Sequence, residues 1–361
     1  MSKTTLSQLE KAPKKLGFFS RVLDEASAAE RYRLLGEQII HAEKHGFDTA
    51  WLAQHHFHEF EGGLPSPLTF LAYIAAQTSR IRLGTGVICL PMESPIRVAE
   101  DAVVADLISE GRLEVGVGTG GTLESYQAFG VDSSQRGPVM ARNMQLLRDA
   151  WAGNALPGGV KLYPHNATLN QRIWQATFAV EGGERAGQEG DGLLLSRTQP
   201  RPEGQPNATL SEIQQPIVDA YLAALPEGAA PRIMASRTLF VADSREEALK
   251  LADTGIRRSI SRNNGLAKKQ GVTETTPLPE LLRAYDAHVG TPEDVLETLS
   301  QDHILKYATD IVFQVHSIDP PHPYILRSIE LIADEVAPKL GWQSQTSPSH
   351  KPVRIPERLA S

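Results

Sequence analysis

The hydrophobic positions of the chain form short apolar runs that alternate with longer amphipathic stretches. The runs are typical of buried strands, and the stretches between them have helical spacing. We predict eight strands, at Lys15–Phe19, Thr49–Ala53, Ile81–Leu90, Leu113–Gly118, Trp174–Val180, Gly192–Ser196, Ile233–Val241 and Asp310–His316. Helices are predicted between most of them, among others at Glu30–Lys44, Pro67–Thr78, Ile96–Ile108, Gly137–Trp151 and Ser211–Leu225.

This alternation predicts the fold class. Repeated strand–helix units imply a parallel sheet with helices outside it. Eight units fit closure into a single (β/α)8 TIM barrel better than an open sheet. An open sheet that binds a dinucleotide would carry a Gly-x-Gly-x-x-Gly turn after its first strand, and no such turn stands there. We therefore expect an α/β protein with one barrel.

Four segments fall outside the repeat. We expect residues 1–14 to be an N-terminal extension, residues 15–340 to form the barrel, and the polar, proline-rich residues 341–361 to be a C-terminal tail. Ala152–Asn170, rich in glycine, proline and asparagine, is predicted to be an irregular insertion. Ser261–Pro279 has no apolar periodicity and is predicted to be a long mobile loop that closes over the barrel mouth.

Composition argues against several classes of protein. The formal net charge of −7 disfavours nucleic acid as the main partner, which needs a basic surface. No apolar run of about 18 residues occurs, so we expect no membrane span. The polar start does not resemble a secretory signal, and the single cysteine, Cys89, is compatible with a reducing cytoplasm. We expect a cytoplasmic protein.

The loop after the second predicted strand holds the densest candidate chemistry. In a barrel, such loops at the carboxyl ends of strands carry the site. Three of the 11 histidines lie there, at His55, His56 and His58. His56 and His58 could bind a metal with His316 as a further ligand, or one of the histidines could contact an organic cofactor as acid or base, or all could cap the barrel mouth through backbone hydrogen bonds. Because other strand ends offer poor ligands such as Ser196, we favour the cofactor and expect no metal.

Two glycine motifs are compatible with a bound ligand. Glycines inside a strand, as at Gly84 and Gly86, often mark the close approach of a ligand or of another backbone segment. Glu181-Gly182-Gly183 leads into a short predicted helix, whose free N–H groups could bind a phosphate. Each motif could equally be an ordinary structural turn.

Spaced motifs along the chain resemble a known family. Phe47–Phe60 (FDTAWLAQHHFHEF) is similar to a segment of bacterial luciferase and of the luciferase-like flavin monooxygenases. Further similar segments follow in the same order, at residues 83–87, 94–97, 100–101, 111–116, 129–132, 290–293 and 335–338. The resemblance covers most of residues 15–340. It implies a (β/α)8 barrel, usually a dimer, that uses reduced FMN and O2, often with the flavin supplied by a separate reductase.

The resemblance also implies roles for individual residues. His55 matches the family's catalytic histidine beside the flavin. Gly86-Val87 matches a cis peptide bond under the flavin ring, and Thr119 stands where luciferase has a phosphate-binding arginine. Gln54 replaces the usual glutamate. The expected cofactor contacts are Ala53, Gly86, Val87, Thr119, Glu181, Gly182, Gly183 and Ser196.

The expected function is FMN-dependent monooxygenation of a small organic substrate by a homodimer. No NADH-binding motif is visible, which fits a two-component system with a transient flavin reductase as partner. Three alternatives remain open: an oxidoreductase that uses the deazaflavin F420, a non-catalytic flavin-binding protein, and a metal hydrolase that uses His56 and His58.

Overall fold

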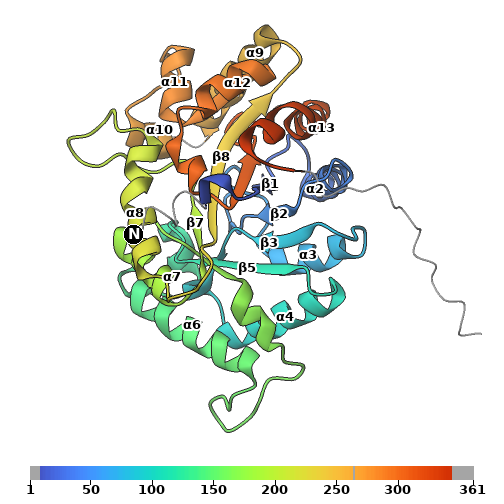
Figure 1. The fold of residues 1–361 in the computed structure, drawn as a ribbon, viewed down its shortest axis with the longest axis vertical. Helices are drawn as coiled ribbons and strands as arrows, with labels where there is room; N and C mark the ends of the chain where they lie inside the picture. Colours follow the sequence, from blue (N-terminus) through green and yellow to red (C-terminus); the bar gives the residue numbers. More distant parts are fainter. Residues whose placement is uncertain (1–8, 263–264, 344–361) are drawn as a thin grey trace, which may run out of the picture.

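Eight parallel strands close into a barrel, as predicted (Figure 1). The computed structural model describes residues 9–262 and 265–343. The barrel strands are β1 (Lys15–Ser20), β2 (Thr49–Leu52), β3 (Arg82–Thr85), β5 (Leu113–Gly118), β6 (Ile173–Ala176), β7 (Gly192–Leu195), β8 (Ile233–Val241) and β10 (Asp310–Gln314). The barrel is closed because β10 pairs with β1 on one side and with β8 on the other.

Helices surround the barrel on the outside (Figure 1). Helices that follow barrel strands and lie around the barrel include α2 (Ala28–Lys44), α3 (Pro67–Ala75), α4 (Pro95–Ile108), α6 (Arg136–Ala152), α7 (Val180–Gln188), α8 (Leu210–Ala224) and α13 (His322–Leu331). Local signals set their ends: Thr209 and Glu212 form a capping box at the start of α8, and Gly153 ends α6 in a left-handed conformation. No helix within residues 9–262 and 265–343 is long and apolar enough to cross a membrane.

The inside of the barrel is filled by large side chains. Trp51 and Trp174 meet edge to face with ring centroids 5.6 Å apart, in a cluster that also contains Leu194 and Met234. Gly84 makes room for this cluster, because a Cβ on Gly84 would lie 2.2 Å from Cε3 of Trp51. Close packing inside the barrel, rather than a ligand, therefore explains this glycine.

The predicted strand Ile81–Leu90 is divided in two. β3 ends at Thr85, and the short strand β4 (Ile88–Cys89) pairs further along β5. Between them, the Gly86-Val87 peptide bond is cis, as the resemblance implied. The break lies at the carboxyl end of β3, so the backbone of Gly86 and Val87 faces the mouth of the barrel.

One strand continues beyond the barrel and supports a second hydrophobic cluster. The last residues of β8, Thr238–Val241, pair with β9 (Ala287–Gly290), a strand that the sequence analysis missed. Around Phe240, this cluster joins α9 (Arg245–Arg262), α10 (Gly265–Gln270) and α11 (Leu278–Ala284). Figure 1 shows α9, α10 and α11 with α12 (Pro292–Leu299) at the end toward which β8 projects.

The prediction of a loop without regular structure over Ser261–Pro279 is wrong. The segment contains the end of α9, all of α10 and the beginning of α11, while residues 263–264 lie outside the described part. Ala267 is buried in the second cluster and Leu266 packs against it. Two adjacent apolar residues were too few to show helical periodicity in a polar segment, yet they anchor α10.

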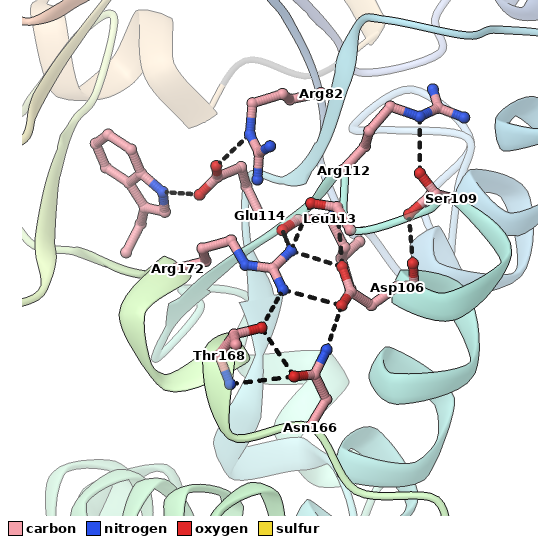
Figure 2. Close-up of polar contacts among 11 residues, drawn as sticks. Arg82, Asp106, Ser109, Arg112, Leu113, Glu114, Asn166, Thr168 and Arg172 are labelled. Carbon is pink, nitrogen blue, oxygen red and sulfur yellow. Dashed lines mark hydrogen bonds and ion pairs between the residues drawn. The ribbon is translucent and has the colours of Figure 1, made fainter.

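The amino-terminal ends of the strands are joined by buried ion pairs (Figure 2). Arg172, just before β6, donates to both carboxylate oxygens of Asp106 in α4, over 2.6 and 2.9 Å. Asn166 donates to the same carboxylate over 2.7 Å. Nearby, Glu114 in β5 accepts from Arg82 of β3 and from the indole of Trp174 in β6. This network ties α4 and three strands together at the end of the barrel opposite the mouth.

The packed part of the chain reaches into the predicted tail. Trp342 is buried, and its indole N–H donates to Oδ2 of Asp48 over 2.8 Å. Residues 344–361 and residues 1–8 lie outside the described part, so most of the predicted tail and of the N-terminal extension stays a prediction.

Candidate active site

His55 follows the carboxyl end of β2 and stands at the barrel mouth. Its backbone N–H donates to the carbonyl of Leu64 over 3.1 Å, and its ring lies against Gly62. Burial, and next the charge of Arg21, hold the pKa of His55 well below its usual range. The imidazole is therefore neutral near pH 7 and can accept one hydrogen bond and donate another.

A cavity of about 150 Å³ opens beside His55. We call it the His55 cavity; its walls include Ala53, His55, Gly86, Val87, Gly120 and Gly121. The structure thus brings together four of the residues expected from the sequence to bind or act on a flavin. Gly86, Gly120 and Gly121 carry no side chains, so a planar ring could approach this part of the wall closely.

Gln54 links two strand ends beneath this cavity. Its side-chain carbonyl accepts the backbone N–H of Cys89 over 2.7 Å, and its amide donates to a carboxylate oxygen of Glu93 over 2.7 Å. A glutamate in its place would bring two carboxylates together. Glu93 therefore explains why glutamine suits position 54, since the Gln54 amide can donate to its carboxylate.

His56 and His58 have different surroundings from His55. The ring of His56 meets that of Phe129 edge to face, with centroids 4.8 Å apart. The Nε2 atoms of His56 and His58 are buried without a hydrogen-bond partner. His316 instead pairs with Asp319, Nδ1 to Oδ2, over 2.8 Å. Within the described residues these histidines do not gather into a set of three ligand atoms, so the metal-hydrolase alternative lacks its ligands there.

The two glycines of the expected phosphate-binding turn have a structural role. Glu181, Gly182 and Gly183 lie in the first turn of α7, not in a loop before it. A Cβ on Gly182 would lie 2.0 Å from Oγ1 of Thr177, and one on Gly183 would lie 2.6 Å from the carbonyl of Ile217. Both glycines therefore allow α7 to pack closely. Glu181 itself is exposed.

Thr119 follows β5 and is half-buried. Its carbonyl accepts a hydrogen bond from the hydroxyl of Tyr126, which fixes the turn after the strand. Neither Thr119 nor the first turn of α7 lines the His55 cavity. Whether they bind a phosphate stays a prediction.

A second cavity, of about 250 Å³, lies between the ends of β1, β7 and β10. We call it the Arg197 cavity; among its walls are Arg21, Ser196, Arg197, Tyr285 and His316. Ser196 was expected to contact the cofactor and belongs here, away from the other expected contacts. The sequence analysis missed Arg21 and Tyr285.

Burial and neighbouring charges shift the pKa values of charged groups at and beside this cavity. Burial, and then Arg21, lower the pKa of Arg197 to about 9. Burial also raises the pKa of Asp319 to about 7, against the opposing effect of Arg197 and other arginines. Asp319 is therefore partly protonated near pH 7 and balances the arginines only in part.

Comparison with known proteins agrees with this barrel fold. The fold defines the chain as a (β/α)8 barrel, a class whose active sites lie at the carboxyl ends of the strands. The profile of the luciferase-like monooxygenases matches residues 16–303, so the chain belongs to the luciferase-like monooxygenase family of oxidoreductases.

Curated relatives align over much of the chain. An uncharacterized protein, y4vJ, of Sinorhizobium fredii is 27% identical over 331 residues, which cover 86% of this chain and 92% of the relative. The oxygenase component of the flavin-dependent trigonelline monooxygenase of Acinetobacter baylyi is 26% identical and aligns over 63% of this chain and 64% of its own length.

Solved structures share the fold. The monooxygenase RslO1 of Streptomyces bottropensis superposes with a TM-score of 0.74 at 26% identity, over 90% of this chain and 99% of that one. The oxygenating constituent of 3,6-diketocamphane monooxygenase of Pseudomonas putida, in complex with FMN, has a TM-score of 0.70 at 19% identity over 91% and 99%. An F420-dependent secondary alcohol dehydrogenase has a TM-score of 0.65 at 15% identity over 92% and 100%.

Proposed function

We propose that the protein is the oxygenase component of a two-component monooxygenase, which uses reduced FMN and O2 to oxygenate a small organic substrate. The observation that carries the proposal is the His55 cavity, where a neutral histidine shares the wall with three glycines and Ala53. Family membership, and relatives named as flavin-dependent monooxygenases, support the same chemistry.

The residues of the His55 cavity fit a flavin ring. Gly86, Val87, Gly120 and Gly121 form one part of the wall, and Ala53 adds a small apolar surface, while Met92 and His56 line other parts. Reduced flavin, when bound, supplies the electrons that activate O2. Thr119 and the amino-terminal turn of α7 are proposed to hold its phosphate through the Thr119 hydroxyl and backbone N–H groups at the start of α7, where those of Gly182 and Gly183 also donate to the carbonyl of Ala179.

His55 is proposed to position and move a proton at its imidazole. Because the ring is neutral near pH 7, one nitrogen can donate a hydrogen bond while the other accepts one. The enclosing walls exclude water from the reacting atoms, which protects a reactive site from side reactions.

The test separates this function from its alternatives. The pure protein should oxidise NADH slowly or not at all, and an added flavin reductase that supplies reduced FMN should restore O2 consumption that depends on substrate. Fast, substrate-dependent oxidation of NADH by the protein alone would contradict the two-component proposal. Binding of F420 in place of FMN, or flavin binding without turnover of any substrate, would favour the corresponding alternative.

We also propose that the protein forms a homodimer through α3 and α4. These adjacent helices expose Tyr73, Val104, Leu107 and Ile108, each between 46% and 56% exposed. Exposed apolar side chains on neighbouring helices are typical of an interaction surface. Light scattering of the intact chain should give twice the monomer mass, and Leu107→Lys should shift it toward the monomer.

A further inference from the structure

The Arg197 cavity holds two arginines that no carboxylate neutralises directly. The guanidinium of Arg197, which is 5% exposed, donates to the hydroxyls of Thr238 and Ser317 over 3.0 and 3.2 Å. Arg21 donates from both Nε and Nη2 to the backbone carbonyl of Glu61. Within residues 9–262 and 265–343, neither guanidinium is paired with a carboxylate within 4.0 Å.

The acidic groups nearby have other partners. Glu61 also lines the cavity and favours the charged form of Arg21, and its carboxylate accepts from the hydroxyl of Thr122 over 3.3 Å. Asp319 shares a hydrogen bond with Nδ1 of His316, and Asp286 is bound by Arg201 over 2.6 Å. A buried charge that is not paired is costly to desolvate, so most proteins avoid it or use it for a ligand. The two arginines therefore leave positive charge at the wall of an accessible cavity.

A third polar group points to the same ligand. Tyr285 is 1% exposed and lines the Arg197 cavity, and its hydroxyl has no hydrogen-bond partner. Buried hydroxyls almost always have a partner, so an orphaned one at a cavity wall indicates a missing acceptor. Since a hydroxyl and a guanidinium both donate, an oxyanion could satisfy Tyr285 and the arginines at once.

The remaining walls suit an organic body attached to that anion. Phe60, Phe178 and Leu266 line the same cavity, and the two phenylalanines are 42% and 60% exposed. A volume of about 250 Å³ fits a small molecule. Cationic groups at one side and apolar rings at another are the usual arrangement for a small organic acid.

We propose that the Arg197 cavity binds the carboxylate of the substrate, so that the monooxygenase acts on a small organic acid. The identification of the ligand as the substrate rests on the proposed function. The oxyanion site itself is inferred only from the geometry of Arg21, Arg197 and Tyr285. A phosphate offers the same chemistry, and its source would be the flavin. The experiment therefore includes flavins with and without a phosphate.

The experiment measures binding to the intact protein by titration calorimetry. The probes are benzoate, its neutral analogue benzamide, oxidised FMN, and riboflavin, which lacks the phosphate. The variants are Arg197→Met, which removes the charge but keeps an apolar side chain, and Tyr285→Phe, which removes the orphaned hydroxyl alone. Arg245→Met is the matched control, because Arg245 is on the surface of α9 and bonds to Asp294, away from the cavity.

Benzoate is expected to bind at least about tenfold more tightly than benzamide. Arg197→Met should weaken benzoate binding about 10- to 100-fold and Tyr285→Phe about tenfold, while Arg245→Met leaves it unchanged. FMN and riboflavin should bind the parent protein and Arg197→Met alike. Thermal melting of each variant checks that the protein is folded, and Tyr285→Phe keeps the test valid if Arg197→Met does not fold.

Three results overturn the assignment to the substrate: equal binding of benzoate and benzamide, benzoate binding that neither variant weakens, or a loss of FMN affinity in Arg197→Met without a loss for riboflavin. The loss of FMN affinity alone would mean that the oxyanion bound in this cavity is the phosphate of the flavin. If benzoate binds through Arg197 and Tyr285 but the parent protein binds no flavin, the anion site stands and the proposed monooxygenase function fails.

Discussion

Gly62 gives the imidazole of His55 the space that it occupies. A Cβ on Gly62 would lie 2.4 Å from Cδ2 and 2.8 Å from Cβ of His55, closer than real Cβ atoms approach. Gly62 and Leu64 both belong to the loop that follows the histidine segment, and Leu64 also accepts the backbone N–H of His55. The loop after β2 thus folds back and fixes its own histidine at the barrel mouth.

Replacing His55 by alanine should separate catalysis from stability. The variant is expected to fold and to bind FMN with nearly the parent affinity, because backbone contacts of the His55 cavity and the phosphate donors remain. Turnover with reduced FMN should fall by about 10²–10⁴-fold, the usual worth of positioned acid–base help. Rate per folded molecule, flavin affinity and melting temperature would be measured together.

His56→Ala is the control for this experiment. The His56 ring packs on Phe129, so its loss should lower the melting temperature more than the rate. If His55→Ala turned over like the parent protein, the catalytic role of His55 would be wrong.

Gly62→Ala should reproduce part of the His55 defect without removing the histidine. The added methyl group must displace the ring, since its contacts include Cβ of His55, which is not the flexible end of a side chain. We expect a loss of stability of about 1–3 kcal/mol from overpacking and a lower turnover per folded molecule. Gly137→Ala is the matched control because nothing lies within 4 Å of the Cβ added there. A variant with unchanged turnover would show that the position of the ring is not critical.

Arg172→Met tests the network at the other end of the barrel (Figure 2). The Asp106 side chain is 2% exposed and would keep its charge while losing its bidentate partner. Breaking such a buried pair costs about 3–5 kcal/mol, which urea unfolding would measure. Flavin affinity of the folded fraction should be unchanged.

The comparison for that prediction is Arg33→Met. Arg33 is 53% exposed and pairs with Glu30 and Glu37 on the surface of α2, where water screens the ion pairs, so its loss should cost far less stability than the loss of Arg172. Equal effects of the two substitutions would mean that burial of the Asp106 pair adds nothing to stability.

Asp310→Asn should stabilise the protein more at pH 8 than at pH 5. Burial raises the pKa of Asp310 to about 6, and its Oδ1 atom has no hydrogen-bond partner. A raised pKa in the folded state means that the protonated form is favoured, so stability is lost as the pH rises from the unfolded value of 3.8 through about 6. Asparagine cannot ionise and avoids that loss.

The expected gain of Asp310→Asn over the parent protein grows by about 1 kcal/mol between pH 5 and pH 8. Urea unfolding at the two pH values measures it. A difference between variant and parent that stays constant with pH would show that Asp310 titrates normally in the folded chain.

The strands and the position of His55 could be predicted because their signals are local. Each barrel strand is a short apolar run, and the segment around His55 carries a motif within a few residues. Strand β9 was missed because Ala287–Gly290 has four residues and is half-exposed along most of its length. It forms because β8 extends beyond the barrel and offers a free edge, which is a tertiary effect.

The Arg197 cavity could be predicted only in part. Arg21 directly follows the carboxyl end of β1, so the rule that barrel sites lie at these ends could have indicated it. Tyr285 carries no such signal, because it reaches the cavity from the end of α11 after the chain has passed through the second cluster. At residues 182–183 the motif that is typical of phosphate binding also has a packing role in α7, which the sequence did not reveal, and its binding of a phosphate stays a prediction.

The two cavities are formed by different parts of the fold. The second hydrophobic cluster, around the projecting end of β8, supports only the Arg197 cavity. The His55 cavity stands on the loops after β2, β3 and β5, whereas Tyr285, Leu266 and Lys269 bring part of the Arg197 cavity wall from α10 and the end of α11. Changes confined to these two helices can therefore reshape one cavity without touching the other. A lineage of such proteins could acquire new substrates by replacing an appendage of the barrel while inheriting its oxygen chemistry intact.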